Sequence, residues 1–566
     1  MSTAFTQDNR PLVLETPLGK DTLLLESFQG HEAISQLFSY RLTVRSPEAT
    51  INGKDIVGKN VTFSVQDTTG EPRYFNGFVS RLSSGARDAR LRTYNLEVVP
   101  WLWFLTRTSD CRIFQNKSVP QIVEQIFTDL QFTDFTKSDI KGNHPQREYC
   151  VQYNETDFAF VSRLMEEEGI FYYFRHENGK HTLVLADQKS AHRDGKHNEL
   201  EYNVTGLTPQ NELQLASWQR RVELRPGVYT HTDYNFETPT VDLMSKTNTV
   251  VSTNGDEPYE VYEYPGTFRQ RDDGQSLSKM RMEAHEAAYD VIESSSYSRW
   301  LNPGEKFKVK QHIIASDKGK GYVITGVSHS AHVGADYETG ESTSSAVYHN
   351  AFTCIPDTYT FRPHRTTPKP RVHGVQTAVV TGPPGEEIWP DKYGRVRVQF
   401  FWDREGQKDE KSTCWVRVAH YWAGKQWGSM NIPRVGHEVL VDFIDGDVDR
   451  PVIVGSLYNA GNMPAYELPK FKTMSYVKSD TSPGSKGFNE LRFEDKQGKE
   501  QVFLHSQGRM DVRTKGSLFE TIGGSRNESI GVPSDKNKDG GSLNITVGGE
   551  YNLHVMKDTF IGLDKK

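Results

Sequence analysis

Near the end of the chain, glycines recur every eight residues, and apolar residues recur in step with them. Side chains return to the same face every 3.6 residues in a helix and every two residues in a strand. A spacing of eight fits the strand period and not the helix period, so the pattern indicates strands within an eight-residue repeat. So short a unit cannot close a core alone and must stack on copies of itself. About three clean repeats are visible, which favours several chains winding one thin prism together. The residues predicted to pack this prism are Val502, Leu504, Gly508, Met510, Val512, Gly516, Leu518 and Gly524.

The repeat is imperfect, because Glu520 interrupts the second of its two apolar columns. The alternative is a plain β-meander in which the glycine spacing is coincidental. In the prism, valine, leucine and methionine are expected to fill a thin dry axis, and lysine, arginine, aspartate and serine to stay outside.

Length and charge narrow the class of protein. A chain of 566 residues is expected to hold roughly two to four domains. A net charge of −7 argues against nucleic acid as the main partner. The sequence has no run of eighteen apolar residues, and the opening MSTAFTQDNR has no signal-peptide pattern. We therefore expect the protein to fold in the cytoplasm and, if it leaves the cell, to do so without a cleaved signal.

The first part of the chain mixes strands and helices. Residues 11–100 are predicted to be mainly strands, since short apolar stretches alternate with turns that contain glycine or proline. A first helix is predicted from Ser118, where Gln121 completes a capping box, and a second from about Thr156 to Glu168. A third is predicted over residues 275–291. Its inward face is expected to hold Leu277, Met280, Ala284, Ala287 and Val291.

The second part reads as all-β. Residues 366–380 are predicted to be a linker, and residues 381–458 hold about five short alternating strands, which is typical of a small closed barrel such as an OB-fold. Residues 459–487, rich in proline, serine, lysine and glycine, are predicted to be a second linker before the octads of residues 488–566.

Three patterns resemble chemical sites without completing one. The run from His285 begins like the zinc motif H-E-x-x-H but ends in Tyr289, so a solvated helix face is favoured over a metal site. The consecutive residues 166–168 are glutamates that point around a helix, so a solvated or interface face is favoured over a glycosidase pair. Asp535, Asn537 and Asp539 match half a calcium loop, but a polar loop between rungs is favoured. No catalytic residue, metal or cofactor is predicted.

Aromatic residues gather in the predicted barrel, where they could stack on bases or sugars. A groove that follows a nucleic-acid backbone needs net positive charge, yet the module also carries the carboxylates of Glu386, Glu387, Asp442, Asp445, Asp447 and Asp449. A role in the core and in a subunit interface is favoured instead. The aromatic residues are Trp389, Phe400, Phe401, Trp402, Trp415, Trp422 and Trp427.

Three long, collinear stretches carry a family resemblance. Residues 415–459 read WVRVAHYWAGKQWGSMNIPRVGHEVLVDFIDGDVDRPVIVGSLYN, residues 488–512 read FNELRFEDKQGKEQVFLHSQGRMDV, and residues 153–174 read YNETDFAFVSRLMEEEGIFYYF. They resemble the OB module, the β-helix entry and the hub domain of VgrG proteins, the trimeric spikes of type VI secretion. Val448 stands where the family usually has proline.

The resemblance implies a mainly β homotrimer with a few helices. Residues 1–365 would form the hub, with two barrel-like modules per chain, and three chains would match a hexameric Hcp-type tube. The OB barrels would form a neck, and the octads an intertwined three-sided prism capped by a PAAR-type tip protein. Baseplate proteins and secreted effectors or adaptors are the other implied partners. The implied function is mechanical puncture of a target membrane, without catalysis.

Two other functions remain as alternatives. The acidic residues suggest a cell-wall hydrolase, although no carboxylate pair stands in a recognisable cleft. OB and β-helix parts suggest a carbohydrate-binding adhesin, against which the lack of a secretion signal weighs.

Overall fold

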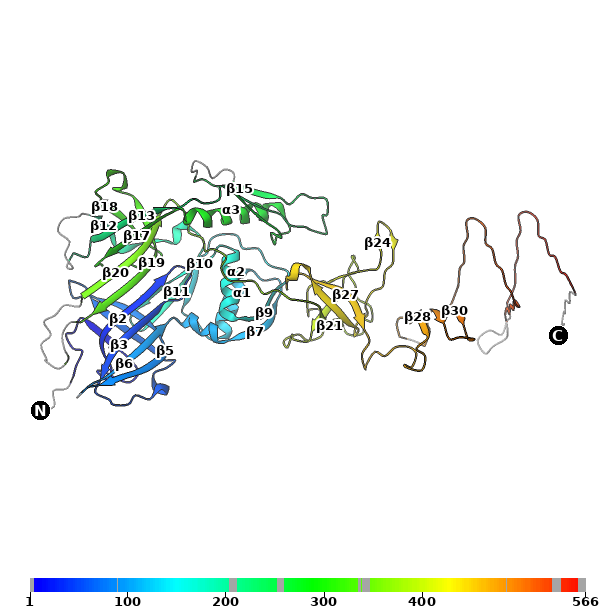
Figure 1. The fold of residues 1–566 in the computed structure, drawn as a ribbon, viewed down its shortest axis with the longest axis horizontal. Coiled ribbons are helices and arrows are strands. Elements are labelled where there is room, and N and C mark those ends of the chain that lie inside the picture. The colour runs from blue at the N-terminus through cyan, green and yellow to red at the C-terminus, as the bar shows by residue number, and fades with distance from the viewer. Residues whose placement is uncertain are drawn as a thin grey trace. The chain divides into compact units, whose positions relative to one another are not determined.

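The computed structural model describes residues 5–88, 90–202, 211–251, 259–333, 337, 347–484, 486–531 and 541–557. The chain divides into two compact units, Met1–Tyr466 and Glu467–Lys566, and each is described by itself. Figure 1 shows the order of their elements along the chain.

The first unit begins with a curved antiparallel sheet whose strand order is β1-β4-β5-β6-β3-β2. Apolar and polar residues alternate along these strands; in β3, for example, Tyr40, Leu42 and Val44 are buried. The strands are β1 (Leu12–Glu15), β2 (Leu24–Ala33), β3 (Ser39–Ser46), β4 (Asn60–Gln66), β5 (Pro72–Arg87) and β6 (Arg92–Val99).

A closed six-stranded barrel continues this sheet, because its strand β19 also pairs with β2. The ring closes through β20, which pairs with β17 on one side and β19 on the other. Its strands are β12 (Arg193–Tyr202), β13 (Gln214–Val222), β17 (Asp290–Ser296), β18 (Glu305–Gln311), β19 (Gly321–His332) and β20 (Val347–Pro356). Closure leaves this ring without an exposed edge.

The helices form largely where the local signals place them. The capping box is confirmed at α1 (Val119–Asp129), where the backbone N–H of Ser118 donates to the Gln121 side chain over 2.9 Å. Helix α2 (Asp157–Glu167) is confirmed, and the Thr156 hydroxyl caps it by accepting the N–H of Ala159.

The third helix, α3 (Arg271–Ala287), begins and ends earlier than predicted. Val291, expected on its inner face, lies instead in β17, where it pairs with Arg221 of β13. The end of the segment predicted to be helical therefore forms a strand, because it pairs with β13, although its apolar spacing is also compatible with a helix.

Shorter elements surround the helices of this unit. Strands β7 and β9 form a two-stranded ribbon, and two three-stranded sheets lie elsewhere in the unit. These strands are β7 (Ser109–Phe114), β8 (Phe135–Asp139), β9 (Cys150–Thr156), β10 (Phe171–Glu177), β11 (Lys180–Ala186), β14 (Val228–His231), β15 (Ser245–Asn248) and β16 (Glu260–Glu263).

The OB-fold barrel ends the first unit and is the predicted small closed barrel. Its strand order is β22-β21-β26-β27-β23, and the ring closes where Val396 and Val416 exchange backbone hydrogen bonds of 3.0 and 2.8 Å. Strand β21 begins inside the stretch expected to be a linker. The strands are β21 (Gln376–Thr381), β22 (Arg397–Phe400), β23 (Arg417–Val418), β26 (Glu438–Phe443) and β27 (Pro451–Leu457).

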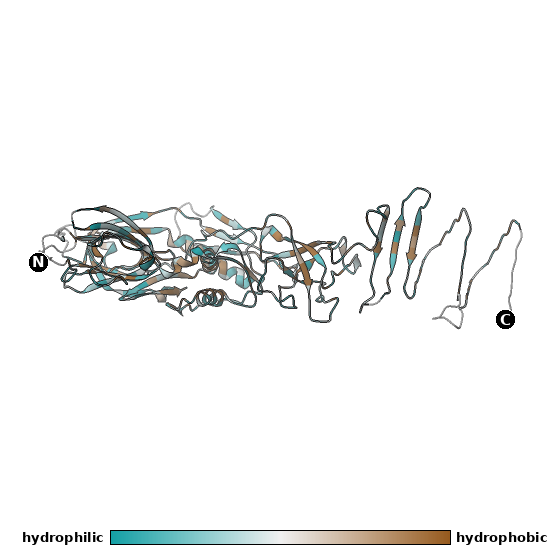
Figure 2. Cartoon of the chain, turned by 90° about the horizontal axis from the view of Figure 1, so that it is seen from below, coloured by the Kyte–Doolittle hydropathy of each residue, from teal (hydrophilic) through white to brown (hydrophobic). Residues whose placement is uncertain are grey.

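The second unit opens with an antiparallel sheet of β28 (Met474–Lys478), β29 (Glu490–Glu494) and β30 (Gln501–His505). Strand β28 lies in the stretch expected to be the second linker. Hydrophilic and hydrophobic segments alternate along these strands in Figure 2. Residues 506–531 and 541–557 carry no helix or strand in the single chain.

Candidate functional site

The first candidate site is the apolar face of the tail. The five apolar side chains predicted to pack a prism are 55 to 72% exposed in the single chain. A methyl group added at any of the three predicted glycines would meet nothing within 4 Å. Large apolar side chains seldom line up in water unless they bind something. In the described part of the chain these side chains stay largely exposed, and packing between copies stays a prediction for Val502, Leu504, Gly508, Met510, Val512, Gly516, Leu518 and Gly524.

The polar residue that interrupts this face has a local partner. Arg526 pairs with Glu520 over 3.0 Å and lies 3.6 Å from Glu528. The carboxylates are thus partly neutralised within the chain, and they are exposed enough for that pairing to contribute little stability.

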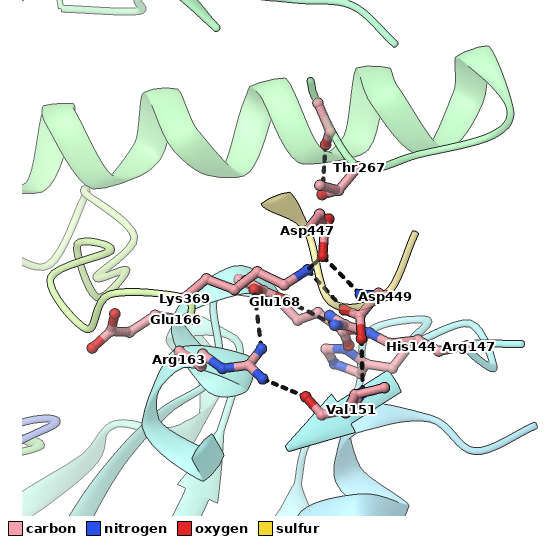
Figure 3. A network of polar contacts seen from close by, with 12 residues as sticks. His144, Arg147, Val151, Arg163, Glu166, Glu168, Thr267, Lys369, Asp447 and Asp449 are labelled. Carbon is pink, nitrogen blue, oxygen red and sulfur yellow. Dashed lines mark hydrogen bonds and ion pairs between the residues drawn. The ribbon is translucent and has the colours of Figure 1, made fainter. Parts of the chain in front are cut away.

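The second candidate site is the junction between the hub and the OB barrel, drawn in Figure 3. The Lys369 ammonium lies 2.7 Å from a carboxylate oxygen of Asp447 and 2.7 Å from one of Asp449. The other oxygen of Asp449 accepts the backbone N–H of Val151 over 2.7 Å. Lys369, which precedes the barrel, thus forms ion pairs with the barrel loop that carries Asp447 and Asp449. The same loop accepts a hydrogen bond from hub strand β9.

Apolar packing crosses the same junction. Tyr149 and Val151 of the hub belong to the hydrophobic cluster of the barrel, together with Val380 and Val398. Close-packed interiors have low compressibility and transmit strain. Hub and barrel are therefore joined by a shared core as well as by ion pairs.

The three consecutive glutamates complete the junction. Glu166 accepts the backbone N–H groups of Thr366 and Thr367, each over 2.9 Å. Its neighbour Glu167 lies 2.7 Å from the Arg147 guanidinium, and Glu168 lies 2.9 Å from the same group. The side chains diverge around the helix end, as predicted, and each binds another segment. Full solvation is wrong for this face, because Glu168 is buried, and a role in an interface between chains stays a prediction.

Burial and neighbouring charges set the protonation of this cluster. Burial alone would raise the pKa of Glu167, but Arg147 and Lys369 outweigh it and lower that pKa to about 2. Burial likewise opposes the charge of His144, yet the carboxylates of Asp187 and Glu168 outweigh it and raise the pKa of His144 to about 9. Both groups are charged at neutral pH, and a carboxyl as acidic as Glu167 cannot serve as a general acid.

His144 gives the hub a specific pH dependence. Its two ring nitrogens face Glu168 over 2.7 Å and Asp187 over 3.0 Å, so the doubly protonated ring fits. Because its pKa is raised from about 6.5 to about 9, the stabilisation is complete below pH 6.5 and is lost as the pH rises through 9. The free-energy difference between the natural chain and His144→Gln is expected to fall over that window, by roughly 2–3 kcal/mol.

Denaturant unfolding of the hub at several pH values measures this difference. His373→Gln, an exposed position, is the control and should leave the profile unchanged. A constant difference between the natural chain and His144→Gln from pH 6 to 10 would show that the ring is neutral.

The barrel aromatics divide between core and surface. Phe400 is buried, which confirms the core role, whereas Phe401, Trp422 and Trp427 are more than half exposed. Trp422 and Trp427 meet edge to face, 4.9 Å apart, on the hairpin of β24 (Ala423–Gly424) and β25 (Trp427–Gly428). Their predicted role in a subunit interface stays a prediction.

The structure describes the surroundings of the zinc-like pattern at His285 but not those of the calcium-like pattern. The helix face at His285 is not simply solvated, because Glu286 is buried and accepts the N–H of Val250. Among the described residues, no group of three His, Cys, Asp or Glu side chains is placed to hold a metal ion. The pattern of Asp535, Asn537 and Asp539 lies outside the described residues.

Comparison with known proteins identifies the chain's relatives. Residues 31–335 match the family model of the phage tail baseplate hub (GPD), and residues 386–458 match the type VI secretion system/phage-baseplate injector OB domain. Residues 475–564 match the bacteriophage T4 gp5 C-terminal trimerisation domain. The type VI secretion system spike protein VgrG1c of Pseudomonas aeruginosa is 40% identical over 529 residues, which are 93% of this chain and 72% of that protein.

The chain belongs to the VgrG family of type VI secretion system spike proteins.

Two further relatives show how far the similarity extends, one in fold and one in sequence. The E. coli c3393 protein, a type VI secretion component described as similar to T4 tail proteins gp27 and gp5, shares the VgrG fold. Its TM-score is 0.56 at 23% identity, over 79% of this chain and 100% of that one. The actin cross-linking toxin VgrG1 of Vibrio cholerae is 31% identical over 89% of this chain, but over only 46% of its own length. In the described part of this VgrG chain, no helix is long and apolar enough to cross a membrane.

Proposed function

We propose that this VgrG chain forms a homotrimeric puncturing spike at the tip of a contractile type VI secretion apparatus. The observation that carries the proposal is the tail: its five predicted apolar side chains are 55 to 72% exposed in the single chain, and residues 475–564 match a trimerisation domain. In a three-chain prism each strand pairs with the other chains, so edges are internal except at the end. Each backbone hydrogen bond contributes only about 1 kcal/mol net, but no strand can leave without breaking a whole rung.

The junction supports the mechanical part of the proposal. A needle driven through a membrane has to transmit force from its base to its point. In this chain the hub and the OB barrel share a hydrophobic cluster and the Lys369 ion pairs. Such a joint resists bending because both its apolar and its charged contacts would be lost together.

The proposed partners follow from this role. The hub docks on a hexameric Hcp-type tube among baseplate proteins, a PAAR-type tip protein caps the prism, and effectors or adaptors travel with it. The spike assembles in the bacterial cytoplasm and passes into the target cell or its surroundings. Family membership and the hub-like match of residues 31–335 support these proposals.

We propose no catalysis for residues 1–566. The part of the chain shared with the Vibrio cholerae toxin covers less than half of that protein and is also shared with relatives named as spike proteins. The acidic cluster that motivates a hydrolase is bound in ion pairs at the junction. A peptidoglycan-digestion activity of the purified protein that disappears in Glu167→Gln would contradict this proposal.

The trimer is tested by its mass in solution. Three chains of 64.4 kDa give a species of about 193 kDa, which we expect at micromolar concentration by analytical ultracentrifugation. The trimer is also expected to resist SDS without heating, because the prism must come apart before its strands unfold. A single compact chain at that concentration would contradict the spike proposal.

A further inference from the structure

One segment of the hub is basic, although the chain as a whole has a net charge of −7. Residues 80–107 contain five arginines, no lysine and only two acidic residues. The arginines are Arg81, Arg87, Arg90, Arg92 and Arg107, and the acidic residues are Asp88 and Glu97. Because clustered charge of one sign attracts ligands of the other sign, this segment is expected to attract acidic ligands.

Strand pairing in this segment places one glutamate between two arginines. Glu97 of β6 lies opposite Arg81 of β5 and, on its other side, opposite Arg41 of β3. Directly opposed side chains in an antiparallel sheet are close enough to interact. The Arg81 guanidinium lies 3.5 Å from the Glu97 carboxylate, and these side chains are 74% and 36% exposed. An ion pair this exposed contributes little stability, so Arg81 can turn to another carboxylate at small cost.

A cavity of about 380 Å³ adjoins this ion pair, and its volume is in the range of small-ligand sites. Its lining residues are Ser80, Arg81, Glu97, Trp103 and Arg107, the last two from the 3-10 helix Trp101–Arg107. The Arg107 guanidinium lies 4.2 Å from the centre of the Trp103 ring, where cation–π attraction holds it. In the described part of the chain, Arg107 forms no ion pair with a carboxylate.

The charge of the cavity fits one further carboxylate. Two guanidinium groups and one carboxylate line it, so one positive charge is left over. Arginine presents a planar pair of N–H donors that matches the two oxygens of a carboxylate. The Trp103 ring adds an apolar surface against which the stem of an acidic side chain can pack.

Other anions fit this cavity less well. A phosphate group would bring up to about two negative charges beside Glu97, and a nucleic-acid backbone would bring a row of phosphates. A single carboxylate brings one charge and neutralises the lining. The charge balance therefore favours the side chain of an acidic peptide.

We propose that this cavity binds a glutamate or aspartate side chain of an acidic peptide segment in a partner protein. Arg107 donates to the bound carboxylate, and Arg81 shares its donors between that carboxylate and Glu97. Trp103 packs against the stem of the bound side chain. All residues of the site belong to one chain, so the proposal goes beyond the spike function and does not depend on the trimer.

Hexaglutamate with both termini blocked is the probe, and hexaglutamine is its uncharged control. We expect isothermal titration calorimetry of the full chain to show binding of hexaglutamate at low ionic strength, with an affinity that falls as salt is added. Arg107→Gln is expected to weaken binding about tenfold, because a charge-assisted pair is lost. Arg193→Gln removes the same charge from another strand, where the side chain is 60% exposed, and should leave the affinity unchanged.

Glu97→Gln tests the site in the opposite direction. It removes the carboxylate that competes for Arg81, so the affinity for hexaglutamate should rise, by about threefold. Glu177→Gln removes the same charge from β10, where the side chain is 60% exposed, and should have no effect.

The two glutamate and two arginine variants together decide the proposal. Absence of hexaglutamate binding, or equal binding by the natural chain, Arg107→Gln and Glu97→Gln, would overturn the site. Tighter binding of inorganic phosphate or of a thymidine oligonucleotide than of hexaglutamate would overturn its assignment to an acidic peptide. A natural chain that is monomeric and still binds hexaglutamate would contradict the trimer and leave this inference standing.

Discussion

Val512→Asp is expected to abolish the trimer. Val512 lies four residues before Gly516 and is 69% exposed in the single chain, so burial of its side chain would come from the proposed prism. Aspartate at this position would bring three carboxylates around one narrow axis with no cation beside them. Burying one unpaired charge costs several kcal/mol even after relaxation. In the trimer, each of the three chains would bury one such carboxylate at the same height along the prism.

The matched control is Arg513→Asp, which introduces the same residue one position along, on the face expected to be solvated. This variant should remain a trimer of about 193 kDa, whereas Val512→Asp should sediment as a 64.4 kDa chain. The first unit should stay folded in both variants, because it is compact by itself. A stable trimer of Val512→Asp would mean that this column faces solvent.

Local sequence signals predicted the elements that depend on near neighbours. The capping box at Ser118 and the OB barrel at 381–458 are present, because caps and strand alternation are decided within a few residues. The exposed apolar octads are present too, although the contacts that would bury them belong to other chains. A single chain therefore displays the pattern without its packing.

Features that depend on segments distant in the sequence were not predicted. The end of α3 was misplaced because β17 pairs with β13, and no local signal reports that pairing. The junction was missed because Val151 and Asp449 are 298 residues apart in the sequence and Lys369 lies between them, far from both. The acidic turn of residues 445–449 was visible, but a charged turn is usually solvated, and only the fold reveals the lysine that it faces.

Lys369→Met is expected to weaken the joint between hub and barrel. The Lys369 side chain is 26% exposed, and those of its partners Asp447 and Asp449 are 9% and 14% exposed. Methionine preserves most of the apolar stem but leaves two carboxylates without their cation. Removing one partner of a buried ion pair is strongly destabilising. With partial solvent screening, we expect a loss of about 2–4 kcal/mol in the unfolding of the first unit.

The loss of stability in Lys369→Met should be detectable first at the junction between hub and barrel. The Val151 N–H donates to Asp449 in the natural chain, so its hydrogen exchange is expected to accelerate in Lys369→Met before the hub unfolds globally. Calorimetry should then resolve separate transitions for hub and barrel. Lys180→Met removes a cation from an exposed pair with Glu177, where both side chains are more than half exposed, and should change neither measurement.

A second substitution distinguishes the effect of the unpaired charges from the effect of lost packing on the stability of Lys369→Met. Adding Asp449→Asn to Lys369→Met removes one of the stranded carboxylates while keeping an oxygen that can accept the Val151 N–H. The double variant should therefore recover part of the lost stability, which is the sign of a coupled pair. If Lys369→Met instead unfolds like Lys180→Met, the ion pairs do not join hub to barrel. Force would then have to pass through the shared apolar cluster alone.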